Sequence, residues 1–481
     1  MTVSIQELAQ RSDIKFGTSG LRGLVENLTD EVCFAYTKAF LLSQETTFKK
    51  VAIGHDLRPS SPQITLACIA AIESQGLEAI YLGALPTPAV AYYCLNKKIP
   101  GVVVTGSHIP FDRNGIKFYK ADGEISKADE ESIMGSRIEI EGHNLSASLP
   151  AFDGKAIELY QKRYIDFFGT HFLSGKIIAI YQHSSVARDF LNHLFQAMGA
   201  KTLLLGRSNE FIPIDTEAVR DKDIKQAEKW AKEYDFDMLV STDGDADRPL
   251  IADENGEFFR GDILGILAAQ YLHAEHVVTP VNSNTAVELA NAFKSVRRTK
   301  IGSPFVVEGM KSINKEASHE VVVGFEANGG FMQQTRIIMA GMELNSLPTR
   351  DAVLPMLALV GISKAQKIPM SALIGLLPKR FTQSTRLENV SDDEASSIMS
   401  AILKNTTAVG DFLFKKSIKI IEVNTVDGLR ILFDNQAIVH FRQSGNSPEM
   451  RIYAEASSIK AVRSIICKAM AFVKSYLDMR K

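Results

Sequence analysis

The chain has little net charge and only four cysteines, and it lacks a long apolar run. Lysine and arginine number 54 against 56 aspartates and glutamates, so the formal net charge is −2. Such a balance argues against a nucleic-acid-binding surface or a polybasic membrane patch. The longest apolar runs, such as residues 352–360, fall short of the roughly 18 residues that a membrane helix needs. The N-terminus shows no basic segment followed by an apolar one, so we expect no signal peptide and a cytoplasmic protein.

The cysteines show no paired spacing. Cys33, Cys68 and Cys94 lie in apolar segments, and Cys467 lies in the C-terminal helical stretch. A disulfide framework needs a regular arrangement of cysteines, which this chain does not have. We therefore expect all four to be reduced packing residues.

The length of 481 residues predicts three or four domains. Short β-rich runs alternate with helical patterns in three series, with strands expected at residues 51–54, 79–82 and 101–105, then 176–181, 201–205 and 238–241, then 276–279, 298–302 and 321–325. Alternation of this kind predicts α/β domains with mixed or parallel sheets. After about residue 370 the strands are closely spaced, at 418–422, 428–433, 437–441 and 450–454, and a helix follows over 459–477.

The predicted fold class is therefore α/β, with three related α/β domains and a C-terminal α+β domain of antiparallel type. The expected boundaries are 1–150, 151–260, 261–370 and 371–481. Each of these four segments contains a polar loop next to a predicted strand, and these loops carry the candidate chemistry.

The first loop follows the β-branched run Val102–Thr105, which is typical of a buried parallel strand. A small-residue turn then presents Ser107 and His108, and Pro110 prevents the strand from continuing. Ligands bind at the carboxyl ends of strands in open α/β sheets. A serine there can act as a nucleophile or carry a covalent phosphate if other groups activate and neutralise it.

The second loop follows a strand at 238–241 and contains three carboxylates at alternate positions, Asp243, Asp245 and Asp247. The small spacers Gly244 and Ala246 let the backbone curl around one hard divalent cation, such as Mg²⁺ that also holds a phosphate oxygen. An EF-hand is the best competing interpretation, with Glu254 at its twelfth position. Its sixth position must be glycine but is Arg248 here, and the flanks are β-like, so a catalytic metal loop is favoured.

Two further loops suit a phosphorylated sugar. In residues 324–330, Glu326 and Asn328 can hydrogen-bond vicinal hydroxyls, although Asn-Gly-Gly is also an ordinary turn. In residues 442–447 the donors suit a dianionic phosphate, and the alternative is a polar hairpin without a ligand. These donors are Arg442, Ser444, Gly445, Asn446 and Ser447.

A glycine- and hydroxyl-rich loop near the N-terminus, residues 15–23, is also compatible with phosphate and contains Arg22. Its spacing matches neither the Walker A loop nor the dinucleotide-binding motif. A P-loop kinase and a nicotinamide dehydrogenase are therefore disfavoured.

In this order, the five loops resemble the α-D-phosphohexomutase family, in particular bacterial phosphomannomutases and phosphoglucomutases. The family has four domains around a central cleft, three related α/β domains and a smaller C-terminal one, in agreement with the predicted pattern. The matching segments are Gly17–Gly23, Thr105–Pro110 with Asn114–Lys117, Asp243–Arg248, Phe325–Gly330 and Arg442–Ser447.

The resemblance implies that Ser107 carries a phosphoryl group, and that Mg²⁺ is held by this group and the three aspartates. Lys117 matches the family's proposed general acid/base, a role for which neighbouring cations would have to favour the neutral amine. His108 is implied as an orienting residue, with Arg22 and Arg248 neutralising charge. Glu326 and Asn328 are implied to bind the sugar, and residues 442–447 to bind its phosphate.

The chain departs from the family pattern at four positions. Gly106 and Ile109 replace an alanine and an asparagine, which is tolerable because neither is a ligand or a proton carrier. Gly330 stands where many family members have a histidine, and Ser303 stands where the well-studied dual-specificity enzymes have another. No proton-transfer or sugar-binding role can be transferred to those two positions.

We expect a phosphomannomutase that interconverts mannose 6-phosphate and mannose 1-phosphate through a phosphoserine enzyme and a hexose 1,6-bisphosphate, which also acts as activator. A phosphoglucomutase, a dual-specificity enzyme and a phosphoglucosamine mutase are the alternatives within the family. A metal-dependent sugar phosphatase and a noncatalytic sugar-phosphate sensor are the alternatives outside it. The expected partners are small hexose phosphates, without nucleic acid or membrane, and the expected assembly is a monomer or homodimer.

Overall fold

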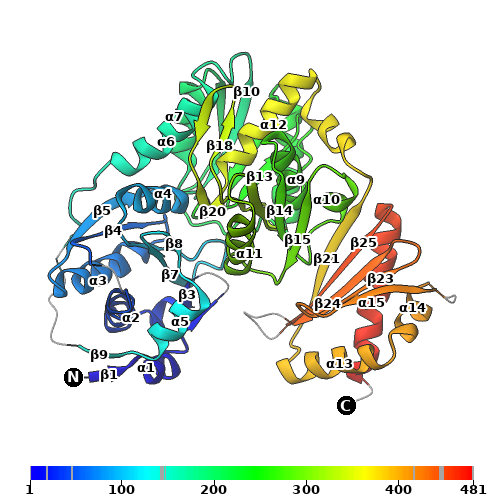
Figure 1. Cartoon of the computed structure of the whole chain (residues 1–481), viewed down its shortest axis with the longest axis horizontal. Coiled ribbons are helices and arrows are strands. Elements are labelled where there is room, and N and C mark those ends of the chain that lie inside the picture. Colours follow the sequence, from blue (N-terminus) through cyan, green and yellow to red (C-terminus); the bar gives the residue numbers. More distant parts are fainter. Residues whose placement is uncertain are drawn as a thin grey trace.

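The computed structural model describes residues 2–17, 20–44, 47–140, 146, 148–414, 418–443 and 449–478. Its four main sheets follow one another in chain order along an arc, from the blue N-terminal part to the red tail in Figure 1. None of the helices among these residues has the length and apolar character that crossing a membrane requires.

The first sheet has the order β2-β3-β7-β6-β4-β5, with β8 paired to β7, and a small pair, β1 and β9, lies apart from it. Helices connect its parallel strands. The strands are β1 (Thr2–Ser4), β2 (Lys15–Phe16), β3 (Leu21–Leu24), β4 (Lys50–His55), β5 (Glu78–Ala84), β6 (Gly101–Val104), β7 (Arg113–Lys120), β8 (Gly123–Glu124) and β9 (Arg137–Glu139). The helices are α1 (Ile5–Ser12), η1 (Val25–Asn27), α2 (Asp30–Leu42), α3 (Ser61–Ser74), α4 (Thr87–Lys97) and α5 (Lys127–Met134).

The second and third sheets continue the alternation of strands and helices. The second contains β10 (Ile177–His183), β11 (Lys201–Arg207), β12 (Met238–Thr242) and β13 (Pro249–Ala252), with α6 (Lys155–Phe168), α7 (Arg188–Ala197) and α8 (Asp221–Glu233). The third contains β14 (His276–Pro280), β15 (Ser295–Thr299), β16 (Val322–Phe325), β17 (Phe331–Gln333) and β20 (Leu347–Asp351), and β18 (Ile337–Met339) pairs with β19 (Met342–Leu344) beside it. Its helices are α9 (Gly261–Tyr271), α10 (Ala286–Leu289), α11 (Ser303–Glu316), α12 (Val353–Gln366) and η2 (Met370–Leu376).

One strand order recurs in all three sheets. Four consecutive strands are arranged as β5-β4-β6-β7, as β11-β10-β12-β13 and as β15-β14-β16-β17, so each sheet places its strands in the order second, first, third, fourth. In every case the first three strands are parallel and the fourth is antiparallel to the third. The prediction of three related α/β domains is confirmed.

The tail forms a fully antiparallel sheet of order β21-β25-β24-β23-β22, as predicted for an α+β domain. Its elements are β21 (Phe381–Glu388), α13 (Asp392–Lys404), α14 (Thr406–Phe414), β22 (Ile420–Asn424), β23 (Leu429–Phe433), β24 (Ile438–Gln443), β25 (Glu449–Ala456) and α15 (Ile459–Asp478). The sequence pattern missed β21, α13 and α14. A capping box of Ser391 and Glu394 begins α13.

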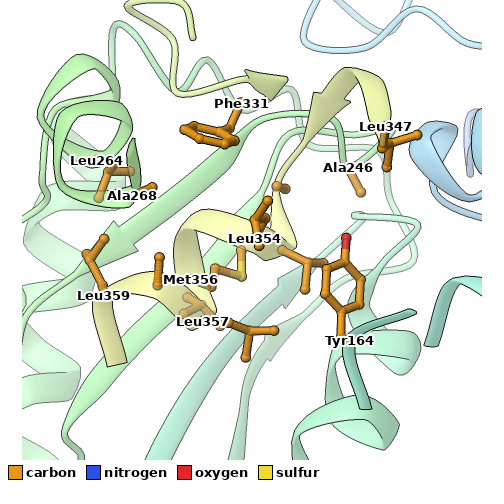
Figure 2. Close-up of a cluster of buried hydrophobic side chains, with 14 of the residues drawn as sticks. Tyr164, Ala246, Leu264, Ala268, Phe331, Leu347, Leu354, Met356, Leu357 and Leu359 are labelled. Carbon is orange, nitrogen blue, oxygen red and sulfur yellow. The ribbon is translucent and has the colours of Figure 1, made fainter. Parts of the chain in front are cut away.

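The buried hydrophobic side chains form separate clusters in the first three sheets and in the tail. A single cluster of buried side chains extends from Ala52 to Leu377 and so joins the first three sheets, whereas the tail has a separate cluster from Val390 to Val473. Figure 2 shows part of the large cluster, in which Leu354 and Leu357 of α12 lie among side chains of several elements. Ala246, a spacer of the three-aspartate loop, belongs to the same cluster, so this loop is anchored on the core.

Two expectations from the sequence are wrong in detail. The strand expected at 298–302 is β15, Ser295–Thr299, because the backbone leaves the sheet before Gly302, the residue that precedes α11. Cys33, Cys68 and Cys94 are buried free thiols as predicted, but Cys467 is exposed on α15 and is not a packing residue. The predicted domain boundaries stay predictions.

Candidate active site

Ser107 lies directly after β6, on a turn whose backbone is strained. Its φ is 51°, a left-handed conformation that is uncommon for a residue with a side chain. The Ser107 N–H donates to Thr105 Oγ1 at 2.8 Å. The Ser107 hydroxyl donates to Asp243 Oδ2 at 2.5 Å, and so the first predicted loop meets the second across 136 residues of sequence.

Asp243, Asp245 and Asp247 are all at most 1% exposed, and one oxygen from each lies within 4.8 Å of the others. Asp245 Oδ1 and Asp247 Oδ1 are buried and accept no hydrogen bond from the described residues. Buried ionised oxygens without partners are costly, and hard divalent cations prefer carboxylate ligands. The three side chains are therefore able to bind a metal ion, and the backbone fits this task because Ala246 adopts a φ of 61° at the turn.

Lys117 lies on β7, opposite Val103 of β6, and is 1% exposed. Its Nζ donates to Asp245 Oδ2 and to Asp247 Oδ2, at 2.6 Å each. Its direct partners are two carboxylates of the metal loop, whereas neighbouring cations are what would favour a neutral amine. Antiparallel pairing of β6 and β7 puts Lys117 beside this loop, and a position ten residues after Ser107 in sequence does not reveal that.

The charges of the loop are strongly coupled. Burial and repulsion by Asp245 and Asp247 raise the pKa of Asp243. Burial opposes ionisation of Asp245 as well, but the Lys117 ammonium outweighs it and lowers the pKa of Asp245. Thr87 Oγ1 adds a hydrogen bond to Asp245 Oδ2 at 2.8 Å. Lys117 therefore offsets part of the repulsion among the three carboxylates, and a bound cation would relieve more of it.

His108 and Arg248 meet beside Ser107. Arg248 Nη1 lies 3.0 Å from His108 Nδ1, and Ser107 Oγ lies 3.3 Å from the same nitrogen. Burial and the Arg248 charge lower the pKa of His108 to about 3. The imidazole is therefore neutral near pH 7, and Nδ1 accepts from Arg248.

Arg22 lies on β3, where it pairs with Gly115 of β7. Burial lowers the pKa of Arg22 to about 10, so the guanidinium stays charged near pH 7, and Asp245 is the acidic group that acts on it most strongly. Thr18 and Ser19 of the same N-terminal loop lie outside the described residues.

The third loop follows β16, and Glu326 and Asn328 are 4% and 7% exposed. Asn328 Oδ1 accepts from the Gly330 N–H at 3.0 Å, and Thr216 Oγ1 of the preceding sheet donates to the Asn328 carbonyl at 2.6 Å. Ser303 Oγ donates to Glu124 of the first sheet at 3.1 Å. Ser303 therefore contributes to the contact between the first and third sheets.

Arg350 of β20 joins the second and third loops, and the sequence analysis missed it. Its Nε and Nη2 lie 3.0 and 2.9 Å from Asp247 Oδ2, and its Nη1 lies 3.2 Å from Glu326 Oε2. A Cβ on Gly330 would lie only 2.5 Å from Arg350 Cδ, so the guanidinium side chain fills the space that a larger residue at 330 would need. The segment Leu-Pro-Thr-Arg-Asp carries no motif, and only packing reveals this role.

The fourth loop is only partly described. Arg442 lies on β24, one residue before its end, and its Nε donates to Asp427 Oδ1 at 2.9 Å, while Asp427 Oδ2 accepts from the Ile301 N–H at 2.8 Å. Within the described part of the chain, Arg442 thus lies at the contact between the tail and the third sheet. Ser444, Gly445, Asn446 and Ser447 lie outside the described residues.

Comparison with known proteins agrees with this arrangement. Residues 13–141, 162–256 and 260–381 match the models for phosphoglucomutase/phosphomannomutase α/β/α domains I, II and III. A phosphomannomutase from Salmonella muenchen is 44% identical over 479 residues, which cover 98% of either chain. The chain belongs to the phosphoglucomutase/phosphomannomutase family.

Two further relatives agree with this assignment. A phosphomannomutase from Sinorhizobium fredii is 39% identical over 471 residues, covering 96% of this chain and 99% of that protein. The crystal structure of a phosphoglucomutase/phosphomannomutase family protein from Burkholderia thailandensis has a TM-score of 0.73 and 19% identity, and the match covers 95% of this chain and 97% of that one. The predicted membership in the α-D-phosphohexomutase family is confirmed, and so is the fold.

In this family member the three sheets present their loops at equivalent places. The loop after β6 carries Ser107, the loop after β12 carries Asp243, and the loop after β16 carries Glu326. Each lies between the third and the fourth strand of the recurring order. One topological position, used three times, therefore holds the residues that the sequence predicts as phosphate carrier, metal ligands and sugar ligands.

Proposed function

We propose that the protein is a phosphomannomutase that interconverts mannose 6-phosphate and mannose 1-phosphate. The contact of the Ser107 hydroxyl with the buried three-aspartate cluster carries the proposal, because a phosphate carrier needs its negative charge neutralised. Mannose is favoured over other hexoses because two relatives, at 44% and 39% identity, bear the name phosphomannomutase.

The proposed reaction begins with a phosphoryl group on Ser107 Oγ. The C1 hydroxyl of mannose 6-phosphate attacks the phosphorus, the Oγ–P bond breaks, and the products are mannose 1,6-bisphosphate and free Ser107. The bisphosphate then turns over in the site, and Ser107 Oγ attacks the phosphorus on O6. Mannose 1-phosphate leaves, and the phosphoserine is restored. The hexose 1,6-bisphosphate is thus both the intermediate and the activator that rephosphorylates the enzyme.

Positive charge around Ser107 supports the transfer. Asp243, Asp245 and Asp247 would hold Mg²⁺ together with an oxygen of the Ser107 phosphate, and the ion would supply neutralisation of the phosphoryl oxygens. Arg22 and Arg248 contribute fixed positive charge.

Protons are moved by the chain's own groups. Lys117 is the proposed proton carrier: its ammonium, which contacts two carboxylates at 2.6 Å, donates a proton to the leaving oxygen, and the amine then takes the proton of the attacking hydroxyl. Neutral His108 orients the site through Nδ1 rather than transferring a proton.

The sugar is proposed to lie between the second and third loops. Glu326 and Asn328 accept and donate hydrogen bonds to vicinal hydroxyls, and Arg350 keeps Glu326 oriented as a carboxylate. Mannose and glucose differ at C2 and share the hydroxyls at C3 and C4. Arg442 and residues 444–447 are proposed to bind the distal phosphate.

We also propose that the enzyme acts in the cytoplasm on small hexose phosphates, as a monomer or homodimer. Its four cysteines are free thiols, which suits a reducing compartment. The separate core of the tail supports a proposed movement of this part on substrate binding.

The decisive test compares the parent with Ser107→Ala in the presence of Mg²⁺ and trace mannose 1,6-bisphosphate. The parent should interconvert the mannose phosphates and carry one phosphoryl group by intact mass, and the variant should lose both properties. Ser148→Ala, at an exposed position, is the matched control and should behave as the parent. Full turnover by Ser107→Ala would refute the mechanism.

The substrate is decided by kcat/KM for mannose, glucose and glucosamine 1-phosphates, measured side by side. A higher value for glucose or glucosamine would assign the enzyme to the corresponding mutase. Release of free phosphate faster than isomer formation would identify a phosphatase instead.

A further inference from the structure

Arg58 is a completely buried charge that the proposed mechanism does not use. It lies in the turn between β4 and α3, and its side chain is 0% exposed. Its Nη1 donates to the carbonyl oxygens of Pro110 and Arg113 at 2.7 Å each, and its Nη2 donates to those of Ser107 at 2.9 Å and Ile109 at 2.5 Å. One guanidinium therefore holds four main-chain carbonyls of the loop that carries the phosphate.

Asp56 fixes the same loop from the other side of Arg58. Its Oδ2 lies 3.4 Å from Arg58 Nε and accepts from Thr105 Oγ1 at 2.7 Å. Thr105 Oγ1 in turn accepts from the Ser107 N–H at 2.8 Å. The N–H and the carbonyl of Ser107 are thus both tied to one buried ion pair, and this connection maintains the left-handed φ of 51°.

The loop between β11 and α8 also contacts Arg58. The Phe211 ring centroid lies 4.0 Å from Arg58 Cζ, in the geometry of a cation–π contact. A Cβ on Gly244, between the metal ligands, would lie 2.8 Å from the Ser107 carbonyl and 3.1 Å from the Phe211 ring. Arg58 is therefore located where the phosphoserine loop meets the metal loop.

The space beside Arg58 is provided by Gly106. A Cβ at this position would lie 2.5 Å from both Arg58 Cζ and Arg58 Nε. Such a distance requires the guanidinium to shift, and the shift would break hydrogen bonds to carbonyls on which the position of Ser107 depends. Glycine at 106, in place of the alanine usual in the family, therefore leaves room for the Arg58 guanidinium in this chain.

We propose that Arg58 is a positioning residue for phosphoryl transfer, which holds the loop from Ser107 to Arg113 so that Ser107 Oγ faces the metal loop, and that Gly106 is required for its placement. The inference rests on the proposed mutase function. Lysine cannot replace Arg58, because an ammonium is a single point of charge and lacks the planar fork that reaches several carbonyls. Misplacing a reacting atom by about 1 Å can cost about 10²-fold in rate.

The test measures single-turnover transfer from Ser107 phosphate to mannose 1-phosphate, with the rate normalised to phosphoserine content by intact mass. Arg58→Lys and Gly106→Ala should each lower this rate and kcat by about 10²-fold. KM for mannose 1-phosphate should change by less than about threefold, because the sugar ligands are untouched. Arg336→Lys and Gly135→Ala, at exposed positions away from this contact, are the matched controls.

The double variant Arg58→Lys/Gly106→Ala separates positioning from general damage. If the added methyl group acts by displacing Arg58, the double variant should transfer no more slowly than Arg58→Lys alone. The inference would be overturned if the double variant lost as much transfer rate as the two single variants combined. It would also be overturned if both single variants had the parent's rate per phosphoserine. A parent enzyme without mutase activity would instead refute the proposed function, so the two failures are distinguishable.

Discussion

Removal of Arg350 should weaken both the stability of the protein and its hold on the sugar. The Arg350 side chain is 2% exposed and contacts Asp247 at 3.0 and 2.9 Å and Glu326 at 3.2 Å. Asp247 keeps its ion pair with Lys117, whereas Arg350 provides the one ion pair of Glu326 within the described part of the chain. Arg350→Ala therefore leaves a buried carboxylate without a partner.

The expected loss follows from the cost of breaking a buried ion pair, about 3–5 kcal/mol of the free energy of unfolding. For a domain of this size the melting temperature should fall on the order of 10 °C. KM for mannose 1-phosphate should rise about tenfold, because a disoriented Glu326 loses one charged hydrogen bond of about 1.5 kcal/mol.

Thermal unfolding in EDTA and in Mg²⁺, together with steady-state kinetics, checks this prediction. The loss of melting temperature should be larger in EDTA, since a cation on the metal loop can compensate Asp247 but not Glu326. Arg350→Lys keeps the charge and should lose less than Arg350→Ala on both measures. A melting temperature and KM equal to the parent's in Arg350→Ala would refute the assigned role.

Three further outcomes are expected. Removal of divalent cations with EDTA should abolish turnover and lower the melting temperature, because the buried carboxylates then repel one another, and addition of Mg²⁺ should restore both. A thiol reagent should label one cysteine of the native protein rapidly, the exposed Cys467, whereas burial of the other three protects them and raises their pKa; rapid labelling of several would contradict the fold. Burial lowers the pKa of His183 and of His440 from 6.5 to about 4. Between pH 6.5 and pH 4 the unfolded chain therefore binds more protons than the folded protein. Each histidine should lower the free energy of unfolding by up to about 1.4 kcal/mol per pH unit as the pH falls through this range. Urea unfolding at several pH values measures this slope, which His440→Gln should reduce.

The tail sheet has a separate core, and this affects how the stability of variants is measured. The largest cluster of buried side chains includes residues of the first three sheets, whereas the tail cluster is separate. Unfolding of variants in the tail should therefore be followed with a probe of its own.

Sequence patterns predicted the strands and the loops because their signals are local. A β-branched run predicts a buried strand, and a turn rich in glycine and aspartate marks where it ends. The rule that ligands bind at carboxyl ends of strands then selected Ser107, Asp243 and Glu326 as candidates. These three follow the third strand of three sheets with the same strand order, a repetition that sequence similarity within the chain did not reveal.

The contacts between these loops were decided by tertiary structure. Lys117 lies between two carboxylates of the metal loop, because β7 pairs with β6 and this pairing brings its side chain beside that loop. Arg58 and Arg350 belong to no recognisable motif, and each acts on residues dozens to more than a hundred positions away. Backbone conformation depends on neighbouring residues and can be predicted from them. An ion pair or a buried hydrogen bond depends on which distant side chains the packed core brings within about 3 Å, and only the folded structure specifies that.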